Sequence, residues 1–72
     1  MSELPILSGK EVLRILQRVG YYVRDQKGSQ IHLRHPTREP LTIPNHRQIA
    51  RGTLRHIIKE AGLGVEEFLR LR

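Results

Sequence analysis

The sequence predicts an α+β fold in one domain of 72 residues, with the order helix, three strands, helix and a short C-terminal helical turn. Apolar residues recur with the 3.6-residue period of a helix near both ends of the chain, and with a period of two between them. A chain of this length has room for only one domain, so residues 1–72 are expected to form one unit. A three-stranded antiparallel sheet with two helices on one face would bury both apolar helix stripes.

The first helix is predicted over residues 9–19. Ser8 and Glu11 have the spacing of a capping box, in which the two side chains bind each other's backbone N–H groups. Gly20 follows the last apolar residue, where a left-handed conformation costs glycine least. The apolar stripe consists of Val12, Ile15, Leu16 and Val19.

Three short strands are predicted over residues 21–24, 30–34 and 41–43. In the first strand, Tyr21 and Val23 are expected to point inward. Lysine, glycine and serine at 27–29 are typical of a turn, and the third strand should end at Pro44, which has no backbone N–H to donate. Short links between the strands favour an antiparallel meander.

The second strand has two distinct faces. Ile31 and Leu33 are expected to be buried, while Gln30, His32 and Arg34 share the opposite face because alternate side chains point to the same side. One strand therefore presents an amide, an imidazole and a guanidinium together.

The second helix is predicted over residues 51–61 and should stop at Gly62. Residues 65–71 form the terminal turn, with Phe68 as its anchor. Leu54, Ile57 and Ile58 are expected to pack against Val12, Leu16, Leu33 and Ile43. This element order is that of double-stranded-RNA-binding domains, although a shared topology does not by itself establish a function.

The net charge of +6 is concentrated in one part of the chain. Thirteen Lys and Arg oppose seven acids overall, and eight bases against two acids between residues 24 and 59 carry the whole excess. Such a distribution indicates a polyanionic partner: nucleic acid, an anionic membrane or an acidic protein. Four bases at a four-residue spacing predict a basic ridge that could follow phosphates or simply solubilise a helix: Arg47, Arg51, Arg55 and Lys59.

Several classes of protein are excluded by composition. The chain has no cysteine, which rules out a disulfide scaffold and thiolate zinc sites. The N-terminus lacks the features of a signal peptide, and no apolar run approaches the length of a membrane-spanning helix. We therefore expect a soluble, cytoplasmic protein that does not associate with membranes.

The histidines suggest two kinds of chemistry. A metal site built from His32, His35 and His46 is disfavoured, because residues three apart on a strand point to opposite faces and no cysteine is present to complete a shell. Neither a metal nor a small-molecule cofactor is expected. His32 could instead carry a proton near neutral pH, as RNA cleavage without metal requires. The pattern alone favours a simpler interpretation, a polar residue on a solvated sheet face.

Six short segments carry a resemblance to a known family: LSGKEV at 7–12, VGY at 19–21, KGS at 27–29, IPNH at 43–46, GTL at 52–54 and EEF at 66–68. In order and spacing, along nearly the whole chain, they resemble the HicA messenger-RNA interferase toxins. The resemblance implies a metal-independent ribonuclease on a double-stranded-RNA-binding-like fold. It also implies a type II toxin–antitoxin pair, in which a HicB-like antitoxin binds the toxin and covers its active face.

One position departs from the family pattern. The family has its catalytic histidine directly after the turn glycine and serine, where this chain has Gln30. A glutamine amide can bind a phosphate oxygen but cannot titrate near neutral pH. Three explanations remain: natural loss of activity, an engineered substitution, or transfer of the role to His32. Alternate residues of a strand lie about 7 Å apart, which displaces a proton acceptor considerably, so impaired activity is preferred.

The site predicted from these arguments therefore has a catalytic part and a binding part. Gln30 occupies the catalytic position and His32 is its possible substitute. RNA binding is assigned to Lys27, Ser29, Arg34, Arg47, Arg51, Arg55 and Lys59. The alternatives are a non-catalytic module that binds RNA or an antitoxin, and a small domain whose basic face serves only an acidic protein partner.

Overall fold

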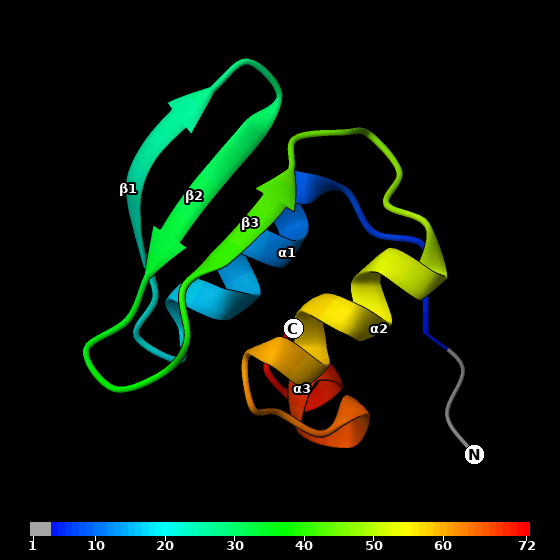
Figure 1. The fold of residues 1–72 in the computed structure, drawn as a ribbon. Coiled ribbons are helices and arrows are strands. Elements are labelled where there is room, and N and C mark those ends of the chain that lie inside the picture. Colours follow the sequence, from blue (N-terminus) through cyan, green and yellow to red (C-terminus); the bar gives the residue numbers. More distant parts are fainter. Residues whose placement is uncertain (1–3) are drawn as a thin grey trace.

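The computed structural model describes residues 4–72 and shows one helix, three strands and two further helices in the predicted order (Figure 1). Their bounds are α1 Gly9–Gln17, β1 Tyr22–Lys27, β2 Gln30–Arg34, β3 Leu41–Pro44, α2 Arg51–Glu60 and α3 Val65–Arg70. The α+β class predicted from the sequence is confirmed. No helix of the described residues is long and apolar enough to cross a membrane.

Helix α1 begins at the predicted capping box. The Ser8 hydroxyl accepts a hydrogen bond from the Glu11 backbone N–H at 3.1 Å, and the Glu11 carboxylate accepts one from the Ser8 backbone N–H at 3.0 Å. The helix ends two residues earlier than predicted, in a turn that leads to Gly20 with φ at +106°. This left-handed conformation suits glycine, as expected.

The sheet is the predicted antiparallel meander, with β2 between β1 and β3. A tight turn that includes Gly28, at a φ of +57°, joins β1 to β2. Helix α1 lies behind the sheet and α2 lies alongside β3, and both pack against β3 (Figure 1). The sheet therefore has one face buried under helices, and we call the opposite face the open face.

The core contains the residues that the two helix stripes predicted. Each of the following is at most 3% exposed: Leu54, Ile57, Ile58, Val12, Leu16, Leu33 and Ile43. Phe68 of α3 is fully buried and joins the same cluster. The predicted burial of these helix and strand residues in one core is therefore confirmed.

Strand β1 differs from its prediction. It begins at Tyr22 and extends to Lys27. Val23 lies opposite the buried Leu33 and so on the covered face, but it is 43% exposed rather than buried. The physical reason is that β1 is an edge strand, whereas α1 and α2 pack on β3 at the other edge. Tyr21 is buried as predicted, and its hydroxyl donates to the Glu39 carbonyl at 2.9 Å. Burial raises the pKa of that hydroxyl, so it remains a neutral donor.

The segment before α1 contributes to the core in a way that the sequence did not predict. Leu4 and Leu7 are buried, and Leu7 forms an isolated antiparallel bridge with Ile49. The Ile49 N–H donates to the Leu7 carbonyl at 2.8 Å, and the Arg51 Nε donates to the Leu4 carbonyl at 2.7 Å. A single bridge produces no hydrophobic period, so pattern analysis does not detect it.

His35 organises the loop after β2. Its Nε2 donates to the Val19 carbonyl at 2.8 Å, since a carbonyl can only accept. Its Nδ1 accepts from the backbone N–H groups of Thr37 and Arg38, both at 3.1 Å. The ring also lies 4.8 Å, centroid to centroid, from the ring of Tyr21. Both ring nitrogens are used by the fold, and this arrangement requires the neutral imidazole.

Candidate functional site on the open face of the sheet

The open face carries polar side chains in cross-strand rows. The predicted side chains Gln30, His32 and Arg34 all point to it, because Ile31 and Leu33 between them are buried. The strand register places Lys27 of β1 opposite Gln30 and Thr42 of β3 opposite His32. The face thus has a row at the β1–β2 turn and a second row at its centre.

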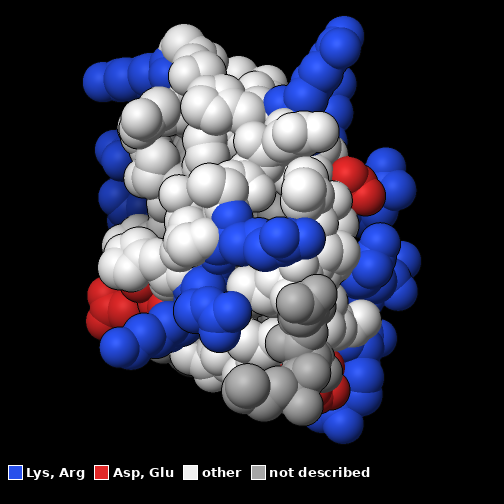
Figure 2. Space-filling view, turned by 90° about the vertical axis from the view of Figure 1, so that its right-hand side faces the viewer, with Lys and Arg blue, Asp and Glu red and all other residues white. Residues whose placement is uncertain are grey.

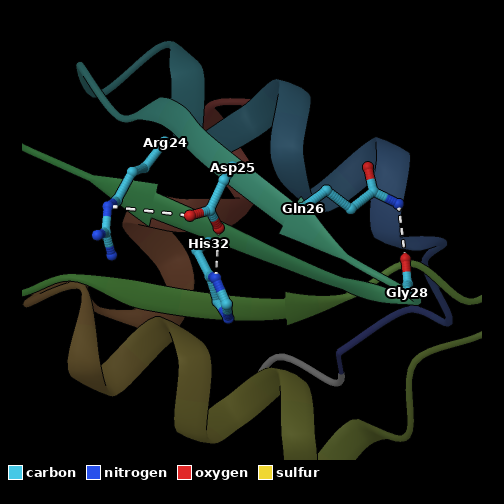
Figure 3. Close-up of polar contacts among 5 residues, drawn as sticks. All are labelled: Arg24, Asp25, Gln26, Gly28 and His32. Atoms are coloured by element: carbon cyan, nitrogen blue, oxygen red, sulfur yellow. Dashed lines mark hydrogen bonds and ion pairs between the residues drawn. The ribbon is translucent and has the colours of Figure 1, made fainter.

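The central row contains a histidine–carboxylate pair. Asp25 of β1 lies opposite His32 in the register, and its Oδ1 lies 2.6 Å from His32 Nδ1 (Figure 3). On the other side of His32, β3 presents the hydroxyl of Thr42. A β2 residue is flanked on both sides, so His32 is half-buried, with 30% of its side chain exposed.

A β-bulge brings Asp25 to this face. Val23 pairs with Leu33 and Asp25 pairs with His32, which leaves Arg24 as an extra residue without a partner. In a regular ladder Arg24 would lie opposite His32, and Asp25 would lie opposite Ile31 on the buried side. The extra residue therefore moves the carboxylate from the covered face to the open face, beside the imidazole.

The electrostatics of the pair determine where its proton lies. The hydrogen bond from His32 lowers the pKa of the Asp25 carboxyl below its ordinary value, and desolvation opposes this effect without cancelling it. Asp25 is therefore ionised near neutral pH and can only accept. It follows that His32 Nδ1 carries a hydrogen and donates it to Asp25. In the neutral ring, Nε2 then keeps its lone pair.

A hollow of about 300 Å³ adjoins His32 on this face. Two arginines line it, Arg24 and Arg34, together with Thr42 and the residues Leu33, Pro40 and Leu41. Arg24 Nε also lies 3.9 Å from Asp25 Oδ2, so this cation is held near the pair (Figure 3). Two arginines beside an imidazole can bind an anion such as a phosphodiester. The imidazole can then accept a proton from a group next to that anion.

The row at the turn has a different character. Gln30 is exposed and lies opposite Lys27, and the turn between them is supported by a 3.0 Å hydrogen bond from Gln26 Nε2 to the Gly28 carbonyl (Figure 3). The Ser29 carbonyl accepts from the Asn45 N–H. This row offers an ammonium group and an amide, which can bind phosphate oxygens but contain no group that titrates near neutral pH.

Only part of the predicted basic ridge lies on a helix. Arg51, Arg55 and Lys59 are exposed on α2, but Arg47 lies in the irregular segment before it, so the four-residue ridge is wrong at this position. The segment before α2 is bound elsewhere by its backbone: Ile49 pairs with Leu7, and the His46 carbonyl accepts from the Gly9 N–H. Figure 2 shows the side of the molecule on which α2 lies, with Lys and Arg side chains across its middle and along its edge.

Two of the basic residues between positions 24 and 59 also form hydrogen bonds that stabilise the fold. Arg51 binds the Leu4 carbonyl through its Nε, as described above. Arg38 donates from Nη1 to the Ala61 carbonyl at 2.8 Å, at the C-terminal end of α2. Arg55 and Lys59 are therefore the α2 cations that remain clear candidates for an external anion.

The histidines proposed for a metal shell are placed separately. His32 binds Asp25 on the open face, while His35 binds the Val19 carbonyl and the backbone N–H groups of Thr37 and Arg38. Within residues 4–72, no three histidine, aspartate or glutamate side chains gather as a metal site would require. His32 was predictable as a site residue from the sequence, but Asp25 and Arg24 were not, because the bulge that places them leaves no signal in the residue pattern.

Comparison with known proteins gives one family match. The family model described as the HicA toxin of bacterial toxin–antitoxin matches residues 9–63. The matched segment includes α1, the whole sheet and α2, and therefore every residue of the open face described above. No curated protein matches the chain with significance.

Proposed function

This chain belongs to the HicA family of toxins of bacterial toxin–antitoxin systems, and from that membership we propose that it is an endoribonuclease that cuts messenger RNA without a metal ion. The single observation that supports this activity is the hollow beside His32, which Arg24 and Arg34 line on an otherwise open sheet face. It combines a proton acceptor with two cationic side chains.

The proposed reaction needs only these groups. A base removes the proton of a ribose 2′-OH, and the 2′ oxygen attacks the adjacent phosphorus. The bond from phosphorus to the 5′ oxygen breaks, and that oxygen takes up a proton. The products are a 2′,3′-cyclic phosphate and a free 5′-OH. The guanidinium groups stabilise the extra negative charge of the phosphorane.

We assign the RNA path to the open face and the neighbouring basic residues. The binding residues are Lys27, Ser29, Arg34, Arg47, Arg51, Arg55 and Lys59, with Arg24 added from the structure. Phosphate contacts of this kind supply affinity and a strong dependence on salt.

A second candidate function is RNA binding without cleavage. Gln30 favours it, because this residue occupies the position that the family resemblance assigns to the catalytic histidine and cannot accept a proton near neutral pH. In that case the chain would keep the surface of a toxin and lack its chemistry.

Family membership implies a cognate antitoxin. We propose that this partner is HicB-like and that it covers the open face, so that bound antitoxin and bound RNA exclude each other. The protein would act in the cytoplasm, where messenger RNA is found.

The test is a cleavage and binding assay on a 5′-labelled single-stranded RNA in EDTA. Cleavage that yields 2′,3′-cyclic phosphate ends supports the nuclease. Binding without cleavage by the parent, with cleavage recovered by Gln30→His, supports the second candidate. If neither protein binds or cleaves RNA, both candidates are wrong. Growth arrest on induction in bacterial cells gives the same comparison in vivo.

A further inference from the structure

We propose that Asp25 is a positioning residue that makes His32 the proton acceptor of the open face, in place of Gln30. The inference rests on the proposed ribonuclease function and specifies how its site works. It concerns the central row of the face, where a carboxylate, an imidazole and a hydroxyl lie on three adjacent strands.

The first step is the orientation of the ring. Asp25 Oδ1 lies 2.6 Å from His32 Nδ1, which is the length of a charge-assisted hydrogen bond. An ionised carboxylate has no proton to give, so Nδ1 is the donor. This bond fixes the neutral tautomer with its hydrogen on Nδ1. Among residues 4–72, His32 Nε2 has no hydrogen-bond partner, and the ring lines the hollow.

The second step is the charge around the ring. The charged groups that face His32 are Asp25 and Arg24 from β1 and Arg34 from its own strand, while β3 contributes the neutral Thr42. Asp25 stabilises the imidazolium that forms when Nε2 accepts a proton. The two arginines face the hollow and can hold the phosphate whose 2′-OH is to be deprotonated.

Neither Gln30 nor His56 has the surroundings of His32. Gln30 lies opposite Lys27, so the turn row pairs an amide with a cation and contains neither a proton acceptor nor a carboxylate to orient one. His56 also has a carboxylate neighbour, Glu60, at 3.2 Å, but this pair lies on the surface of α2, where 69% of the His56 side chain is exposed. It is a matched control away from the hollow.

One histidine can both accept and return the proton that the reaction moves. The 2′-OH proton moves to His32 Nε2 as the 2′ oxygen bonds to phosphorus, and the Nδ1 hydrogen stays in its bond to Asp25. As the bond from phosphorus to the 5′ oxygen breaks, Nε2 returns its proton to that oxygen. His32 ends neutral, and no co-reactant is consumed.

The first measurement is the tautomer, read from the ring ¹⁵N shifts of His32 at pH 8. The parent should show the Nδ1–H form, and Asp25→Ala should shift the ring toward the Nε2–H form that free histidine prefers. Glu60→Ala should leave His32 unchanged, and the same spectra report whether each variant is folded. A parent ring in the Nε2–H form would overturn the proposal whether or not the protein cleaves RNA.

The second measurement is cleavage in EDTA across pH 5–9. His32→Ala should lower kcat by about 10²–10⁴-fold, the usual contribution of a general base. Asp25→Ala should lower kcat by at least about tenfold with little change in KM, since a misplaced base costs rate more than binding. Asp25→Glu should recover part of this loss because it restores a carboxylate.

Further variants separate positioning from general damage. Asp25→Asn should lower kcat across this pH range more than Asp25→Glu does, because an amide can donate to Nδ1 as well as accept from it and so does not fix the tautomer. His56→Ala and Glu60→Gln should match the parent. Cleavage by the parent that persists in His32→Ala would overturn the role of His32 while leaving the proposed function intact. Cleavage by Gln30→His but not by the parent would overturn the role of His32 and support the second candidate, RNA binding without cleavage. Absence of cleavage in all variants, including Gln30→His, would reject the proposed nuclease itself.

Discussion

The two faces of the sheet are built from adjacent residues but serve different purposes. Leu33 points to the buried face and is 1% exposed, while its neighbour His32 points to the open face and borders the hollow. The buried face is entirely aliphatic along β2 and β3, whereas the open face carries amide, imidazole, guanidinium and hydroxyl groups. In β2, residues that stabilise the core therefore alternate with residues of the candidate site. Substitutions at neighbouring positions should affect stability in one case and RNA cleavage or binding in the other.

The largest expected effect is on the buried face. Leu33→Ala should lower the free energy of unfolding by about 2–5 kcal/mol, because it leaves a cavity beneath the helices. His32→Ala should change it much less, since the histidine is partly solvated and fills no core space. Urea unfolding followed by circular dichroism gives both values. Similar losses for the two variants would show that the faces are not separated as described.

A second effect tests how closely α1 packs against the end of β3. Gly9 lies against the end of β3, where an added Cβ would overlap the Pro44 carbonyl oxygen and come within 2.9 Å of Asn45 Cα. Gly9→Ala should therefore cost about 1–3 kcal/mol of stability, as overpacking does. The matched control is Gly52→Ala, also in the first turn of a helix, where nothing lies within 4 Å.

The control should be neutral or stabilising by up to about 0.5–1 kcal/mol, because alanine favours the helix. The measurement is the thermal unfolding midpoint of each alanine variant compared with that of the parent. A Gly9→Ala melt equal to that of Gly52→Ala would show that the contact between α1 and β3 is looser than the structure indicates.

A third effect asks whether the RNA path continues beyond the open face onto α2. Replacing Arg55 and Lys59 together by alanine should flatten the plot of log K against log salt by about 1.4, at roughly 0.7 per single-strand phosphate. Arg51 is kept because it binds the Leu4 carbonyl. The control pair is Lys10→Ala with Arg14→Ala, two exposed cations of α1. Equal slopes for the α1 and α2 pairs would remove α2 from the path.

The smallest effect concerns pH and the carboxylate of the open face. The pKa of Asp25 is lowered in the folded state by its bond with His32, so its contribution to stability is present above the unfolded value of about 3.9. That contribution is lost as the pH falls through the lowered folded pKa. Asp25→Asn should therefore show a shallower loss of stability below about pH 4 in acid titrations of the unfolding midpoint. An unchanged slope would contradict the bond.

Much of the fold was predictable because its signals are local. The capping box at Ser8 and Glu11 defined the start of α1, and Gly62, with φ at +76°, marked the end of α2. The alternation of Ile31 and Leu33 with polar residues assigned both faces of β2 correctly. These features depend on residues a few positions apart, where period and capping act directly.

The remainder depended on contacts between distant segments. Val23 was assigned inward by alternation, but no helix covers β1, and the bulge at Arg24 changes the register beyond it. The same bulge brings Asp25 to His32, so the partner of the candidate base could not be found from strand periodicity. Arg47 was placed on the basic ridge by its spacing, whereas it lies in a bend before α2, next to the bridge between Leu7 and Ile49.

The hydrogen bonds of His35 have a consequence for chemical labelling. Acylation of imidazole requires a free nitrogen lone pair to attack the reagent, and the lone pair of His35 on Nδ1 accepts hydrogen bonds from two backbone N–H groups. His32 keeps its Nε2 lone pair beside a solvent-filled hollow of about 300 Å³. Diethyl pyrocarbonate should therefore modify His32 and spare His35, three residues away on the same chain. Protection of His32 by added RNA, read by mass spectrometry, would then report occupancy of the site without any measurement of cleavage.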